Sequence, residues 1–209
     1  MKKRFDMRIV FGIVLIVAGG LFLLENLGIF HGGINLLWVA ILGGAGVTSL
    51  YLFANNRNNW WALIPGSTLL AISLSIALGV VAPTMSNILG GGIILGGIGL
   101  GFWLIFLTNR DFWWAVIPAG VLSSLAVVAV LEEFINTGGL FLVGLGMTFI
   151  LLAVMPGYEN RLKWGYIPGG ILTLIGVLTM PLLEGIFNIL WPVALIGAGG
   201  YVIYKNFKN

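Results

Sequence analysis

Three stretches of the sequence repeat one pattern of residues. Each begins with Asn-Arg, continues with one or two tryptophans and then reaches an Ile-Pro dipeptide. Their arginines, Arg57, Arg110 and Arg161, lie 53 and 51 residues apart. Self-similarity at a fixed period is the mark of an array of like units, and it constrains the fold more than any local feature does. The period predicts units about 50 residues long.

The sequence between these stretches is almost uncharged. Its mean hydropathy is +1.09 and 8% of its residues are charged, whereas soluble domains carry about 25%. Apolar runs of about 20 residues match a helix that crosses a bilayer, and they lack the period-2 alternation of a barrel strand. We therefore predict an all-α, polytopic membrane protein. Its eight predicted transmembrane helices cover residues 8–27, 34–54, 60–82, 87–107, 112–131, 138–156, 164–183 and 187–204.

The first apolar run follows a basic N-terminus and so imitates a secretory signal. A cleaved signal would carry a small-residue cleavage site after its apolar region. This run instead continues through Gly19-Gly20-Leu21 without one. We expect the run to remain as the first helix.

Each unit is predicted to be a helical hairpin within one membrane domain, 1–209. The units cover approximately 1–56, 57–108, 109–159 and 160–209. The second helix of each unit opens at an asparagine, which we interpret as an N-cap: Asn35, Asn87, Asn136 and Asn188. An even number of helices per unit makes the repeats parallel, unlike the inverted repeats of many transporters. The sequence leaves open whether the hairpins close into a ring or form a curved row.

Basic residues fall on alternate connections between the predicted helices. All ten Lys and Arg residues lie at the N-terminus, in the Asn-Arg loops or in the C-terminal tail, while the intervening loops carry glutamates. Short loops rich in Lys and Arg stay in the cytoplasm. We therefore expect a plasma-membrane protein with both termini cytoplasmic. The net charge of +3 is attributed to this topology, and no nucleic-acid partner is expected.

Two sets of side chains are candidates for functional contacts. The basic set is interpreted as topology anchors or as contacts to lipid headgroups, and consists of Arg57, Arg110, Arg161, Trp60, Trp113 and Trp164. The outer acidic set consists of Glu25, Glu132, Glu133 and Glu184. A carboxylate at a helix C-terminus opposes the helix dipole, which leaves two explanations open. One is a mouth that binds cations or protons, and the other is wetting of the outer surface.

Small and polar residues within the predicted helices suggest close packing. Gly92/Gly96 and Gly97/Gly101 have GxxxG spacing, which lets helix backbones approach each other within the bundle or between copies. The prolines of the Ile-Pro dipeptides either occupy first helical turns or kink the helices. Serine hydroxyls are expected to bond backbone carbonyls or neighbouring helices.

The sequence offers little for catalysis. Cysteine is absent and His31 is the single histidine, so a thiolate nucleophile and a clustered metal site are not expected. No nucleophile lies beside a base. We predict no enzymatic activity and no cofactor.

Two parts of the chain resemble a known family. Phe11-Gly12-Ile13, the segment Gly19-Gly20-Leu21-Phe22-Leu23-Leu24-Glu25-Asn26-Leu27-Gly28 and the later Trp38 resemble the LiaI/LiaF-like transmembrane region of bacterial membrane proteins, as do Ile167-Pro168-Gly169-Gly170 and Asn188-Ile189-Leu190-Trp191-Pro192. The resemblance implies repeated hairpins linked to cell-envelope stress signalling, sometimes through restraint of a sensor kinase. LiaF-type proteins add a soluble C-terminal domain, and this sequence stops at Asn209.

The predicted function is that of a non-catalytic envelope scaffold, accessory or stress-response-associated subunit. Its expected partners are membrane lipids, other membrane proteins or copies of itself. The alternative is a small transporter or channel for an uncharged or apolar solute. Ionisable residues inside a membrane mark the paths of ions and polar solutes, and no Lys, Arg, Asp or Glu is predicted near the centre of a span.

Overall fold

The computed structural model describes residues 7–28, 32–157 and 162–208. Within these ranges the chain forms helices and turns and no strand, which confirms the all-α prediction. The long helices are α1 (Met7–Asn26), α2 (Gly33–Asn55), α3 (Leu63–Val81), α4 (Pro83–Thr108), α5 (Val116–Leu131), α6 (Leu140–Val154), α8 (Tyr166–Leu178) and α9 (Pro181–Lys208). Short 3₁₀ turns precede three of them: η1 (Trp60–Ala62), η2 (Trp113–Ala115) and η3 (Lys163–Gly165).

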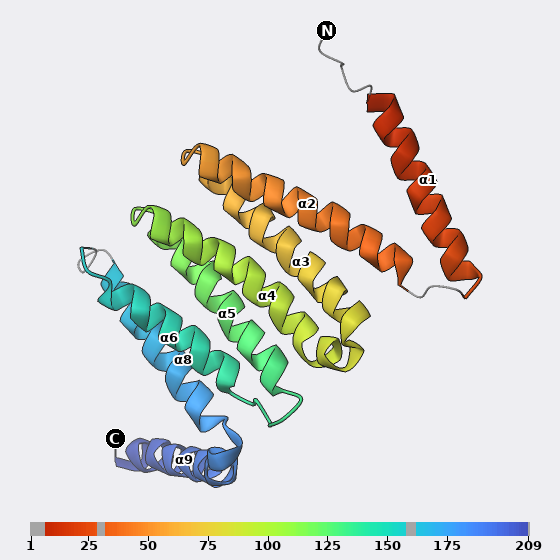
Figure 1. Ribbon diagram of the computed structural model, residues 1–209. Coiled ribbons are helices and arrows are strands. Elements are labelled where there is room, and N and C mark those ends of the chain that lie inside the picture. The colour runs from red at the N-terminus through yellow and green to blue at the C-terminus, as the bar shows by residue number, and fades with distance from the viewer. Residues whose placement is uncertain (1–6, 29–31, 158–161, 209) are drawn as a thin grey trace.

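The helices from α2 to α8 form an open row and not a closed ring (Figure 1). Helices that follow one another in the chain pack against each other. These pairs run from α2 and α3 at one end of the row to α6 and α8 at the other. Helix α1 diverges from α2 at one side of the row, and α9 turns away from α8 at the other. The C-terminal ends of α2, α4 and α6 and the beginnings of α3, α5 and α8 lie along the same side of the row (Figure 1), and we call these ends of the helices the basic-turn end. Helices thus also pack across the predicted unit boundaries, because α2 packs on α3.

Within the described part of the chain, four of the eight predicted spans are helices long and apolar enough to cross a membrane. They cover Gly33–Asn55, Trp60–Val81, Pro83–Thr108 and Trp113–Leu131. Helices α6 and α8 have only 15 and 13 residues, whereas a span needs about 20. Helix α6 stops before Met155-Pro156, because the residue before proline is driven out of helical geometry. Helix α8 stops at Leu178, and Pro181 opens the next helix, α9. Among the residues that the structure describes, four helices are therefore candidate spans.

The capping role predicted for the asparagines is wrong at all four positions. Asn35 lies inside α2, whose N-cap is Gly32 with φ 92°. Asn87 lies inside α4 because Pro83 occupies its first turn, where a missing N–H costs nothing. Asn188 lies inside α9. Asn136 precedes α6, where its Oδ1 accepts a hydrogen bond from the Gly138 amide at 2.9 Å, although Gly139 holds the N-cap position.

The prolines of the Ile-Pro dipeptides occupy first helical turns, as one of the two alternatives predicted. Pro65, Pro118 and Pro168 are each the third residue of α3, α5 and α8 respectively. Amides in the first turn have no partner inside the helix, so a proline there removes no hydrogen bond. The 3₁₀ turns in front of them carry the tryptophans.

Glycines let α4 pack closely on both of its neighbours, which confirms the prediction of tight packing within the bundle. A Cβ on Gly97 would collide with Ala71 of α3, and one on Gly92 would collide with Val130 of α5. A Cβ on Gly101 would likewise meet Ser67 of α3. The two GxxxG pairs therefore do not form a single stripe, because α4 is the centre of three packed helices.

The buried core lies towards the basic-turn end and runs across the row. It includes Phe53 of α2, Leu63 of α3, Ile105 of α4, Val116 of α5 and Leu152 of α6. Elsewhere the faces of the helices carry large exposed apolar side chains. Examples are Val47, Leu107 and Leu174, with exposed fractions of 59%, 58% and 61%.

Candidate functional site

The two fully described basic turns share one local structure. The side-chain oxygen of Asn56 accepts a hydrogen bond from the Asn58 amide at 3.0 Å, and that of Asn109 accepts one from the Asp111 amide at 2.9 Å. The main-chain carbonyls of the same asparagines accept bonds from Asn59 and Phe112 at 3.0 and 3.1 Å. Such side-chain turns are typical of asparagine. The asparagine of each Asn-Arg pair therefore shapes the turn, a role that sequence analysis missed.

The arginines of these turns stack on aromatic rings of the preceding helix. The guanidinium carbon of Arg57 lies 4.6 Å from the centre of the Phe53 ring. That of Arg110 lies 4.5 Å from the centre of the Phe106 ring. Each pair has helical i, i+4 spacing, and such contacts stabilise by about 0.5–1 kcal/mol at exposed sites. Arg161 lies outside the described residues.

The tryptophans divide between packing and exposure. Trp60 packs on Phe112 of the next turn, with ring centres 4.8 Å apart, and on Trp114 at 6.2 Å. Trp113 is half-buried against the core. Trp164 contacts Phe149 of α6 at 5.9 Å yet remains 47% exposed. Aromatic pairs of this kind add about 0.5–1.5 kcal/mol beyond their buried area, so Trp60 links two successive turns of the row.

The Glu25 carboxylate accepts a hydrogen bond at the start of α2. Its Oε2 accepts a hydrogen bond from the amide of Ile34 at 3.0 Å, and Ile34 is the second residue of that helix. First-turn amides have no partner within their helix, and negative charge is favoured at a helix N-terminus. The carboxylate at the end of α1 is therefore explained by the helix that follows it.

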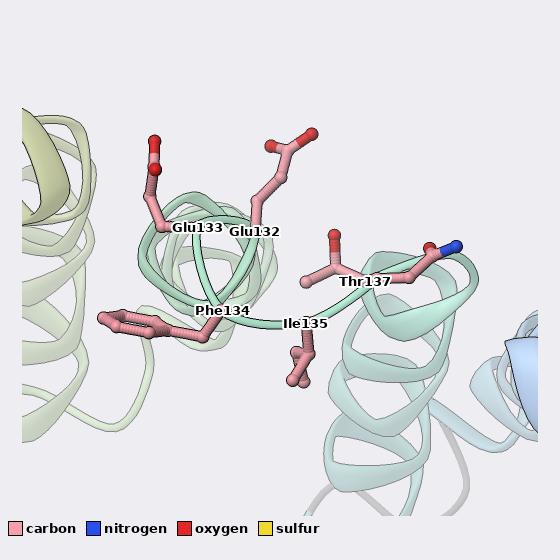
Figure 2. A pocket seen from close by; sticks show the side chains of 6 residues that line it. Glu132, Glu133, Phe134, Ile135 and Thr137 are labelled. Carbon is pink, nitrogen blue, oxygen red and sulfur yellow. The ribbon is translucent and has the colours of Figure 1, made fainter.

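Glu132 and Glu133 lie in the turn after α5, beside a cavity of about 390 Å³. Figure 2 shows both carboxylates and the Thr137 hydroxyl on the same side of this turn, with Ile135 on the opposite side. Glu25 does not line the cavity, and nothing is described of the Glu184 side chain. Among described residues no three His, Cys, Asp or Glu side chains gather to hold a metal. Of the three described side chains of the outer acidic set, the structure therefore brings together Glu132 and Glu133 but not Glu25.

Hydroxyl groups inside the row take part in packing, as expected. Ser73 donates to the carbonyl of Val39 across the α2–α3 interface at 2.9 Å. Ser67 donates to Ile64 within α3 at 3.2 Å. Ser123 accepts a hydrogen bond from the Trp103 indole at 3.1 Å, which joins α5 to α4. These bonds satisfy polar groups among apolar helices.

The fold and these contacts define a class: an all-helical protein whose four long apolar helices suggest a membrane protein. Comparison of the chain with protein-family models, curated proteins and solved structures found no match. The resemblance to the LiaI/LiaF-like region therefore stays a prediction.

Proposed function

We propose that this chain is a non-catalytic multi-pass protein of the plasma membrane, with eight spans arranged as four hairpins. It acts as a scaffold, accessory or stress-response-associated subunit of the cell envelope, through helix–helix or lipid contacts. Both termini and the basic turns face the cytoplasm.

The observation that carries this proposal is the open row itself. Small residues let its helices pack closely on one another. Large apolar side chains such as Leu107 and Leu174 nevertheless remain more than half exposed. Contiguous apolar surface of this kind is rare on soluble monomers and marks contact with lipid or with other proteins. The short helices α6 and α8 are accommodated by local thinning of the bilayer, which costs a fraction of a kcal/mol per Å of mismatch.

Single cysteines test the orientation, because the natural chain has none. Asn58→Cys lies in the first basic turn and Glu133→Cys in the turn after α5, and both positions are exposed. A membrane-impermeant maleimide should label Glu133→Cys in intact cells and Asn58→Cys only after permeabilisation. Labelling of both in intact cells, or the reverse order, contradicts the proposed topology. The cysteine-free protein is the control.

Two measurements separate a scaffold from the transport alternative. Purification from native membranes in mild detergent should recover a defined protein or lipid that can be cross-linked to an exposed helix face. Reconstituted liposomes should show no more solute flux than protein-free liposomes. Flux that depends on the protein contradicts the scaffold proposal.

A further inference from the structure

An apolar groove of about 400 Å³ lies between α4 and α6 near the basic-turn end. Phe106 and Leu107 form part of its α4 wall, and Leu151 and Val154 face them from α6. The residues at which α6 ends, Met155 and Pro156, also line the groove. Met155 has extended geometry, with ψ 122°, and Pro156 follows it, so the helix does not continue past this point.

The α4 wall of this groove is held in place by other contacts. The Trp103 indole, which lines the groove, donates to Ser123 of α5 and packs edge-on against Phe106 with ring centres 6.5 Å apart. Phe106 in turn lies under the guanidinium of Arg110, which also lines the groove. A positive charge therefore stands beside a preformed apolar surface.

The groove is also open to the side of the row. Leu107, Leu151 and Val154 have exposed fractions of 58%, 50% and 55%. A ligand can therefore enter laterally from a surrounding bilayer. The volume of the groove lies near the lower end of the range for small-molecule pockets, about 300–1,000 Å³. A helix of a partner protein, which is about 10–12 Å wide with its side chains, is too large for it.

We propose that the groove binds one anionic phospholipid, with an acyl chain between α4 and α6 and the phosphate beside Arg110. The inference rests on the proposed membrane location. An amphiphile matches both halves of the site, because apolar walls favour buried methylene groups and guanidinium forms strong charge-assisted hydrogen bonds with phosphate. Basic pockets between membrane helices are suited to such headgroups.

Native mass spectrometry of the delipidated full chain in mild detergent tests this site. The protein is titrated with dioleoyl phosphatidylglycerol and, separately, with dioleoyl phosphatidylcholine. The wild type should retain one phosphatidylglycerol in preference to phosphatidylcholine. Arg110→Gln should lower occupancy by phosphatidylglycerol about fivefold, as expected for one basic residue at an anionic surface. Leu151→Trp, which fills the groove, should lower occupancy by both lipids.

Arg57→Gln is the matched control for charge. Arg57 has the same turn and the same stacking on a phenylalanine but does not line this groove. Each substitution removes one positive charge, so general surface attraction predicts similar losses of phosphatidylglycerol in the two variants. The groove site predicts a larger loss in Arg110→Gln. Leu174→Trp, at an exposed position of α8, is the control for added bulk.

Three results would overturn the inference. They are equal loss of phosphatidylglycerol in both arginine variants, unchanged binding by Leu151→Trp, and competition by soluble glycerol phosphate, which would indicate a site for a free anion. Alkaline carbonate extraction of native membranes distinguishes this failure from failure of the proposed function. Protein released by carbonate contradicts the membrane location, whereas retained protein without a lipid preference contradicts only the groove site.

Discussion

Asn56 and Asn109 show how one residue type sets the geometry of a repeated turn. Each side chain replaces a main-chain partner for the amide two residues later, and each main-chain carbonyl closes the turn three residues later. The sequence pattern placed these residues at a turn, but it drew attention to the neighbouring arginines. Asparagine followed by polar residues between two apolar runs is the local signal that could have indicated the side-chain bond.

Asn56→Ala should lower the free energy of unfolding by about 1 kcal/mol, because the Asn58 amide loses its acceptor. Asn58→Ala is the control in the same turn, since it keeps the Asn58 amide and its bond to Asn56. Its effect should stay within about 0.5 kcal/mol. Unfolding in mixed micelles with increasing dodecyl sulfate, followed by circular dichroism, measures both. Equal effects of the two variants would show that the side-chain bond does not stabilise the turn.

Glu25→Ala should loosen the junction of α1 and α2. The Ile34 amide loses the acceptor that it has at 3.0 Å, and removal of an acceptor at a helix start costs about 0.5–2 kcal/mol. Hydrogen exchange at residues 33–36 should become faster. Glu133→Ala, at an exposed carboxylate in another turn, should leave that exchange unchanged. A similar increase in both variants would argue against a local role for Glu25.

At the scale of helices, apolar runs predicted where helices exist better than where they end. The run that contains α4 was expected to begin at 87, and the helix begins at Pro83 because proline is compatible with a first turn. The run that contains α8 was expected to reach 183, and the helix stops at Leu178, ahead of Pro181. Hydropathy is averaged over many residues, whereas ends depend on single prolines and glycines.

Gly97→Ala should destabilise the contact between α3 and α4 by about 1–3 kcal/mol, the usual cost of overpacking. Its new Cβ would collide with Ala71. Gly91→Ala, in the same helix, is the matched control because its Cβ would lie 3.9 Å from Ala129, an ordinary contact. Both substitutions gain the same helix propensity, so their difference in unfolding free energy reports packing. Equal stability of the two variants would contradict close packing of α3 on α4.

At the scale of the whole molecule, the sequence could not decide between a ring and a row. Alternate basic loops fix which ends of the helices lie together, but both arrangements satisfy that pattern. The choice between a ring and a row depends on which faces of the helices pack together. Glycines lie on two faces of α4, and their spacing in the sequence does not say which neighbouring helix each face contacts. The sequence likewise could not decide which outer glutamates lie together. They share a sequence context, but Glu25 does not line the cavity beside Glu132 and Glu133.

Cross-linking should distinguish the two arrangements. In Gly43→Cys/Ser73→Cys the Cβ atoms would lie 3.8 Å apart across α2 and α3, which matches the mean for disulfides, about 3.8 Å. Oxidation should therefore join them. The pair Val47→Cys/Leu174→Cys places one cysteine on α2 and one on α8, which lie at opposite ends of the row. It should resist intramolecular cross-linking by short bis-maleimides. Efficient cross-linking of this second pair would require a closed bundle.

Each helix of the row packs mainly on its neighbours in the chain. Stability in such a linear arrangement is approximately a sum of local segment and nearest-neighbour terms. A pair of helices can therefore be gained or lost at one edge by gene duplication or deletion without repacking the remainder. Nearest-neighbour packing also lets the chain fold while it is synthesised, because each new helix packs on the helix made just before it.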